Sequence, residues 1–221
     1  MTADPGDGWH ALMLAMDLEP GSVAGCVLRG RELAVWRDAR GVAHVWDDRC
    51  PHRGMRLSLG FLREGTLACL YHGWRFGPDG RCAHIPAHPE LSPPATIRAA
   101  PWAAVERHGL IWARPVAEGA EVPGVEIGAD GHVWTGAWTG VRSLRVGAPA
   151  ERVAGVIGLA AGRLAGVLDR DVHGAVLAAI LPVDGDACML HVLAGSMAGA
   201  ARLHALADWA RDMRGCAEEA A

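Results

Sequence analysis

Short apolar runs alternate with turn residues through the first half of the chain. Between residues 21 and 47 the apolar runs cover residues 26–28, 32–36 and 42–46, and the turns cover 29–31 and 38–41. This alternation is typical of an antiparallel meander. A further strand is expected at 66–69, and runs at 102–106 and 110–113 predict a hairpin around the turn 107–109. The first half is therefore predicted to be all-β.

Helical periodicity enters only in the second half. Residues 150–167 are rich in alanine and predict a helix, and a second helix is expected within 197–214. The apolar stripe of this second helix is Leu203, Leu206, Ala210 and Met213, which is typical of a core face or a subunit interface. Strands are expected at 133–146, 175–182 and 187–193, the last two forming a hairpin. We expect the terminal helix to pack on this small sheet.

The change of pattern divides the chain into two predicted domains. Residues 115–123 contain proline and charged side chains, which is typical of a linker. We therefore expect domains at residues 1–116 and 117–221 and, taken together, an α+β fold.

Composition narrows the class of protein. Half of the 221 residues are apolar, the formal net charge is −4 and all 21 basic residues are Arg, without any basic block. A nucleic-acid partner is not expected from this charge distribution. The first residues are acidic and the apolar stretch after them is short, so neither a signal peptide nor a membrane span is expected, and the cytoplasm is the predicted location. Six cysteines in such a chain predict reduced thiols or metal ligands.

Four of the potential ligands form two short clusters. Cys50 and His52 are separated by one residue, Cys69 and His72 by two, and sixteen residues lie between the clusters. Four such side chains can hold one zinc ion, which accepts mixed sulfur and nitrogen ligands. They can also hold a [2Fe-2S] cluster, with two cysteines on one iron and two histidines on the other. The spacing alone leaves both alternatives open.

The segments CPHRG at residues 50–54 and CLYHGW at 69–74 resemble the two cluster-binding loops of Rieske iron–sulfur proteins. The likeness extends over residues 9–115 and is closest to the N-terminal domain of Rieske non-haem iron (ring-hydroxylating) oxygenases. The resemblance implies a [2Fe-2S] cluster held by Cys50, His52, Cys69 and His72. It also implies an antiparallel β-sandwich with an inserted cluster-binding subdomain.

The residues around these loops indicate a low reduction potential. Respiratory Rieske proteins are similar in motif, but they carry an extra cysteine in each loop and a Ser that donates to the cluster; Met55, Tyr71 and Trp74 stand there in this chain. Fewer donors stabilise the reduced cluster less, so we expect a potential at the low end of the roughly −150 to +300 mV Rieske range. Candidates for tuning the cluster are Arg53, Trp74 and the backbone of Gly54 and Gly73. Met55, Leu57 and Trp74 are candidates for an apolar collar where a partner docks.

The second half resembles a shortened helix-grip domain, the catalytic domain of these oxygenases. In that family an Asn, an Asp and a His-x4-His pair surround a mononuclear iron, but this chain contains no Asn, and its histidines after the linker are His132, His173, His191 and His204. None of these four are five residues apart. Asp169, His173 and His191 are the candidates for a divergent iron site.

Three functions are compatible with these features. The first is an electron-transfer protein or the Rieske component of an oxygenase, passing single electrons from a reductase or ferredoxin to a mononuclear iron on a partner chain, in a homo- or hetero-oligomer. The second is a self-sufficient Rieske mono- or dioxygenase with a divergent iron site. The third is a non-catalytic redox-sensing or scaffolding subunit.

Overall fold

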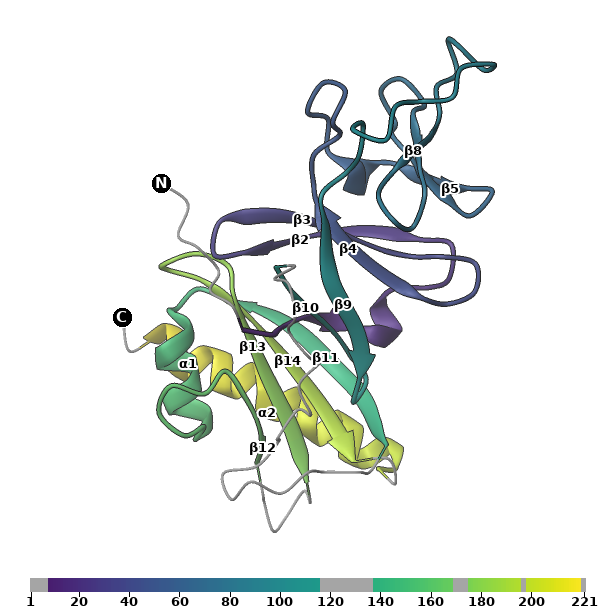
Figure 1. The fold of residues 1–221 in the computed structure, drawn as a ribbon. Coiled ribbons are helices and arrows are strands. Elements are labelled where there is room, and N and C mark those ends of the chain that lie inside the picture. Colours follow the sequence, from purple (N-terminus) through teal and green to yellow (C-terminus); the bar gives the residue numbers. More distant parts are fainter. Residues whose placement is uncertain (1–7, 116–136, 169–174, 196–197, 220–221) are drawn as a thin grey trace.

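The computed structural model describes residues 8–115, 137–168, 175–195 and 198–219. Figure 1 shows three parts: a β domain, a small cluster of strands at one end of it, and a sheet with two helices at the other. The predicted α+β class is confirmed. The predicted boundary at residue 116 lies outside the described residues, so the division into 1–116 and 117–221 stays a prediction.

Six strands form the antiparallel β domain, in the order β1-β10-β9-β4-β3-β2. They are β1 (His10–Leu14), β2 (Val23–Leu28), β3 (Arg31–Arg37), β4 (Ala43–Asp47), β9 (Pro101–Arg107) and β10 (Leu110–Arg114). The predicted meander and hairpin are confirmed, but the sequence pattern missed β1. A bulge between Ala11 and Met13 breaks the alternation of inward and outward side chains that identifies a strand.

The β domain has the packing of a sandwich. Only two residue pairs, Val45 with Trp102 and Trp46 with Pro101, join β4 to β9 and so link the three strands on each side. Side chains from both sides enter one buried core, which includes Leu12, Leu33, Val35, Val45, Trp102 and Ile111. The expected β-sandwich follows from this shared core, because each three-stranded half buries its apolar face against the other.

Four short strands are inserted between β4 and β9. They are β5 (Phe61–Arg63), β6 (Thr66–Ala68), β7 (Arg75–Phe76) and β8 (Cys82–His84), and the short 3-10 helices η1 (Ala15–Asp17) and η2 (Leu57–Leu59) precede β2 and β5 respectively. Trp36 of β3 and Trp46 of β4 meet edge to face, with ring centroids 5.0 Å apart, and pack with Phe76 in one core. These large side chains fasten the inserted subdomain to the main sheet.

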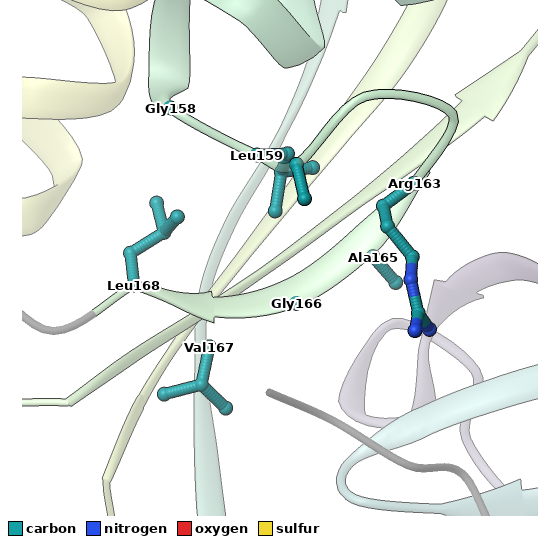
Figure 2. A pocket seen from close by; sticks show the side chains of 8 residues that line it. Gly158, Leu159, Arg163, Ala165, Gly166, Val167 and Leu168 are labelled. Atoms are coloured by element: carbon teal, nitrogen blue, oxygen red, sulfur yellow. The ribbon is translucent and has the colours of Figure 1, made fainter. Parts of the chain in front are cut away.

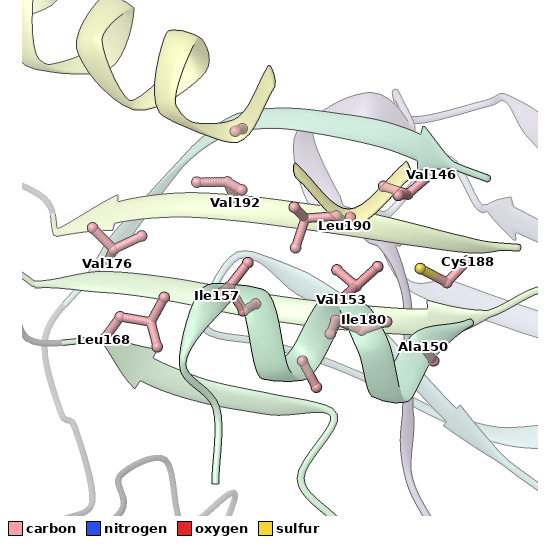
Figure 3. Close-up of a cluster of buried hydrophobic side chains, with 14 of the residues drawn as sticks. Val146, Ala150, Val153, Ile157, Leu168, Val176, Ile180, Cys188, Leu190 and Val192 are labelled. Atoms are coloured by element: carbon pink, nitrogen blue, oxygen red, sulfur yellow. The ribbon is translucent and has the colours of Figure 1, made fainter. Parts of the chain in front are cut away.

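The C-terminal part is a four-stranded antiparallel sheet with two helices on one face. Its strand order is β11-β14-β13-β12, and its elements are β11 (Trp138–Val146), α1 (Ala150–Ile157), β12 (Ala165–Leu168), β13 (Val176–Pro182), β14 (Cys188–Gly195) and α2 (Ala200–Glu219). Figure 3 shows Ile180, Leu190 and Val192 of the sheet facing Val153 and Ile157 of α1. The predicted stripe of α2 lies in this core, where Leu206 and Ala210 are fully buried.

The predicted helix over residues 150–167 is wrong in its second half. Gly158 ends α1 with φ of +83°, and its N–H is directed to the carbonyls of Ala154 and Gly155. This left-handed conformation favours glycine and stops a helix. Residues 165–168 then pair with β13, because strand pairing outweighs the weak helical preference of an alanine-rich segment.

The other face of the C-terminal sheet packs on the β domain. The N–H groups of Arg29 and Gly30, in the β2–β3 turn, donate to the carbonyls of Pro182 and Val183 at 2.8 and 2.7 Å. Leu181 belongs to the core of the β-sandwich. Within the described ranges, no helix is long and apolar enough to cross a membrane.

The buried Arg37 ties together the turns at one end of the sandwich. Its guanidinium donates to the carbonyls of Ala15, Leu18 and Gly41 and pairs with Glu106 at 2.6 Å. Arg37 is only 7% exposed, so its removal would leave several acceptors without a donor.

Arg37→Met is expected to lower the free energy of unfolding by about 3 to 5 kcal/mol, because breaking a buried charged network is costly. Urea unfolding followed by far-UV circular dichroism measures the change. The matched control is Arg81→Met, since Arg81 and its partner Asp79 are 64% and 60% exposed; this variant is expected to lose less than about 1 kcal/mol. Equal losses in the two variants would contradict the assignment.

Candidate metal centre

The two loops that carry the candidate ligands have the same backbone hydrogen bonds. In the first, the Cys50 N–H donates to the Met55 carbonyl and the Gly54 N–H to the Cys50 carbonyl, both at 2.8 Å. In the second, the Cys69 N–H donates to the Trp74 carbonyl and the Gly73 N–H to the Cys69 carbonyl, both at 2.9 Å. Each loop therefore folds back on its own cysteine over the same number of residues.

Glycine makes this fold-back possible in each loop. Gly54 has φ of +74° and Gly73 has φ of +68°, in the left-handed region that L side chains rarely adopt. At Gly73 a Cβ atom would also lie 3.1 Å from the Pro86 ring. The spacing from cysteine to glycine in both motifs is thus a requirement of the turn.

The two thiols meet inside the protein. Cys50 and Cys69 are each 2% exposed, and their thiols interact directly. The pKa of Cys50 is raised to about 11, first by burial and then by the Cys69 thiol, against the lowering effect of the His52 and Arg53 backbone amides. These amides are directed at the Cys50 sulfur, where they would stabilise a thiolate bound to a metal.

The two imidazoles meet at the surface. The ring centroids of His52 and His72 are 4.7 Å apart, and His72 is exposed while His52 is half-buried. The four side chains thus form a buried thiol pair and a more exposed imidazole pair. This donor set fits a cluster of two irons, with one pair on each. Among the described residues, no group of three or more His, Cys, Asp or Glu side chains could hold a single metal ion.

An aromatic ring stacks on each imidazole. Trp74 lies parallel to His52, with an interplanar angle of 5° and centroids 4.3 Å apart. Tyr71 stacks on His72 with centroids 3.9 Å apart. These contacts fix the orientation of the imidazoles, as the outer shell of a metal site commonly does.

Asp48 anchors the first loop, and sequence analysis did not identify it. Its carboxylate is 6% exposed and accepts from both the backbone N–H and the hydroxyl of Ser58. This ties the residues just before Cys50 to η2. In the sequence, the pair of adjacent acidic residues Asp47 and Asp48 was the only signal of this anchor. The partner of Asp48 is Ser58, ten residues away.

The predicted apolar collar is wrong at Leu57. This side chain is fully buried under the loops, whereas Met55 and Trp74 are half-buried. The large apolar side chains exposed in the inserted subdomain and the segment after it are Leu59, Phe61, Leu70, Tyr71 and Leu91. Leu57 was misassigned because a single 3-10 turn does not reveal from sequence which side faces inward.

Two of the three candidates for a divergent iron site, Asp169 and His173, lie outside the described residues, so this site stays a prediction. His191 lies on β14, 1% exposed, with its Nδ1 atom 2.9 Å from the Ser143 hydroxyl. A small pocket of about 40 Å³ beside β12 is lined by Leu159, Arg163 and Val167 among others (Figure 2), and contains no His, Cys, Asp or Glu.

The remaining cysteines lie much as expected. Cys82 and Cys188 are buried, and Cys216 near the end of α2 is exposed. Cys26 is half-buried on β2. Burial raises the pKa of the Cys82 thiol, which keeps it protonated.

Most of the β domain, together with its inserted loops, is similar to known proteins. The sequence model of the Rieske [2Fe-2S] domain family matches residues 8–99. Oxidoreductase NdmD of Pseudomonas putida is 40% identical over 105 residues, covering 47% of this chain and 18% of that protein. The 4beta-methylsterol monooxygenase of Methylococcus capsulatus is 36% identical over 137 residues, covering 58% of this chain and 37% of that one. The chain thus spans well under half the length of these relatives.

A solved structure extends the likeness of fold beyond the family match. Apo dicamba monooxygenase superimposes with a TM-score of 0.76 over 99% of this chain and 87% of that one, at 20% identity. At this identity the match shows the fold alone. Because the match covers nearly the whole chain, the likeness of fold continues past residue 99.

Replacing any of Cys50, Cys69, His52 or His72 is expected to remove the cluster, because one of its two irons would lose one of its two protein ligands. Cys50→Ser and His72→Ala are the test variants, and iron, acid-labile sulfide and the visible absorption spectrum are the measurements. Cys82→Ser is the matched control, since this buried cysteine belongs to the same core as Cys50 and Cys69. A cluster retained in Cys50→Ser, or lost only in Cys82→Ser, would contradict the assignment.

Proposed function

Because residues 8–99 match the Rieske [2Fe-2S] domain family, we propose that this chain is the Rieske component of an oxygenase system and carries single electrons. It takes them from a reductase or ferredoxin and passes them to a mononuclear iron on a partner chain, within a homo- or hetero-oligomer in the cytoplasm. The observation that carries this proposal is the polarity of the site, with its thiols buried and its imidazoles toward the surface.

The four proposed ligands form two pairs with different roles. Cys50 and Cys69 would hold one iron and His52 and His72 the other, and the bound cluster would supply reversible one-electron chemistry. The buried thiol pair excludes water from the inner side. The imidazoles give a partner the shortest approach, because His72 is exposed and lies beside the exposed Tyr71.

The sequence of the second half supports a mononuclear iron on a partner chain rather than on this one. The family motif of Asn, Asp and paired histidines is lacking in its sequence. Relatives described as the oxygenase component of chloroacetanilide N-alkylformylase and of 3-ketosteroid-9-alpha-monooxygenase match over 30% and 28% of their length. The activity of such a whole protein is therefore proposed for the system and not for this chain alone.

The reduction potential is expected at the low end of the roughly −150 to +300 mV Rieske range. The Ser hydroxyl that donates to the cluster in respiratory Rieske proteins is replaced here by Trp74, whose ring stacks on His52, so the reduced state is expected to be less stabilised. Redox titration followed by EPR measures the midpoint. Trp74→Ser, which introduces a hydroxyl beside the cluster, is expected to raise it, and Trp74→Phe is the control. A strongly positive midpoint in the unaltered chain would contradict the proposal.

Two irons and two acid-labile sulfides per chain are expected after anaerobic purification, together with a reduced-state EPR signal of mixed Cys and His ligation. Metal analysis tests the carrier role directly, and the chain reduced by a ferredoxin or flavin reductase should transfer one electron per cluster to an added acceptor. A third, mononuclear iron that is lost in His173→Ala would favour a self-sufficient oxygenase. A cluster that no reductase reduces would favour the sensing or scaffolding role.

A further inference from the structure

A cleft of about 380 Å³ lies between the β domain and the C-terminal sheet. Its walls come from β1, η1 and β2 on one side and from β11, β13 and β14 on the other. Most of its lining is apolar, including Leu12, Ala24, Val27, Leu181, Val183 and Met189. This volume and composition are those of a site for a small molecule.

Three polar side chains form a chain of hydrogen bonds along the cleft. The Ser143 hydroxyl donates to Asp17 Oδ2 at 3.3 Å, and its oxygen is 2.9 Å from Nδ1 of His191. A hydroxyl has one proton, so the proton between Ser143 and His191 must come from the ring. His191 is thereby held with its proton on Nδ1, and Nε2 is left as an acceptor.

Nε2 of His191 is buried and has no hydrogen-bond partner. Burial lowers the pKa of His191 to about 4, and the Leu12 carbonyl offsets part of this effect. The ring is therefore neutral near pH 7 and cannot donate from Nε2. A buried acceptor without a donor costs free energy, which a suitable ligand would recover.

We propose that this cleft binds a small, largely apolar molecule that carries one hydroxyl group, an alcohol or a phenol, whose O–H donates to Nε2 of His191. Met189 lies two residues from His191 on the same face of β14 and also lines the cleft, where its flexible side chain can adapt to a bound molecule. Asp17 and Arg145 line the cleft with opposite charges, so the site does not select an ion. The proposal is independent of the electron-carrier function, because the cleft contains none of the cluster ligands.

The test uses the full chain with its oxidised cluster and ¹⁵N-labelled histidine. The probe is 4-ethylphenol, and its methyl ether 4-ethylanisole is the matched compound without a donor. NMR titration is expected to give at least about tenfold tighter binding of the phenol, the size of one hydrogen bond. The Nε2 resonance of His191 should be that of an unprotonated nitrogen and should shift only with the phenol. Equal affinity for the two compounds, or a protonated Nε2 in the free protein, would overturn the proposal.

Two variants locate the binding site. Cys26→Trp places a large ring in the cleft and is expected to abolish binding of both compounds, whereas Cys216→Trp on α2, outside the cleft, leaves binding unchanged. Ser143→Ala releases the ring from its fixed tautomer and is expected to remove most of the preference for the phenol. Iron and sulfide content, unchanged in all three variants, shows that each has folded. Binding that survives Cys26→Trp, or a preference unaltered in Ser143→Ala, would refute the site.

Discussion

The direct contact of the Cys50 and Cys69 thiols inside the protein is the constraint on which the inserted subdomain depends. The two cysteines belong to different loops, and both loops must turn sharply to bring the sulfur atoms to one buried point. Two glycines at positive φ allow those turns. Without a bound metal the arrangement gains little, because two buried thiols form only a weak hydrogen bond and burial raises the pKa of the Cys50 thiol. The proposed cluster, bound by these sulfurs as thiolates, would supply the missing stabilisation.

Contacts from the residues around the two loops hold the site in a fixed geometry. Asp48 ties the first loop to η2, and Trp74 of the second loop stacks on His52 of the first. Trp36 and Trp46 connect this region to the main sheet. The loops are thus held from both ends, while the imidazoles remain toward solvent. A protein that exchanges electrons with partners needs this combination of a fixed centre and a short route to the surface.

The C-terminal sheet uses its two faces differently. One face is covered by α1 and α2 in an apolar core. The other packs on the β domain, where the apolar contacts of Leu181 stand beside the polar chain of Asp17, Ser143 and His191. The C-terminal sheet therefore does more than enclose its own core, because it buries one side of the β domain and forms one wall of a cleft.

Local chemistry along the chain determined the meander, the hairpins, the stripe of α2 and the resemblance of the two loops, because turns, periodicity and ligand spacing are properties of neighbouring residues. Features that depend on distant partners were decided only by the tertiary structure. The strand β1 is hidden by a bulge, β12 forms because it can pair with β13, and Leu57 is buried because η2 lies under the loops. The same holds for the hydrogen bonds of His191, whose partner Ser143 is 48 residues away and is itself linked to Asp17 across 126 residues. No local pattern encodes these contacts, since they arise only when the two halves of the chain pack together.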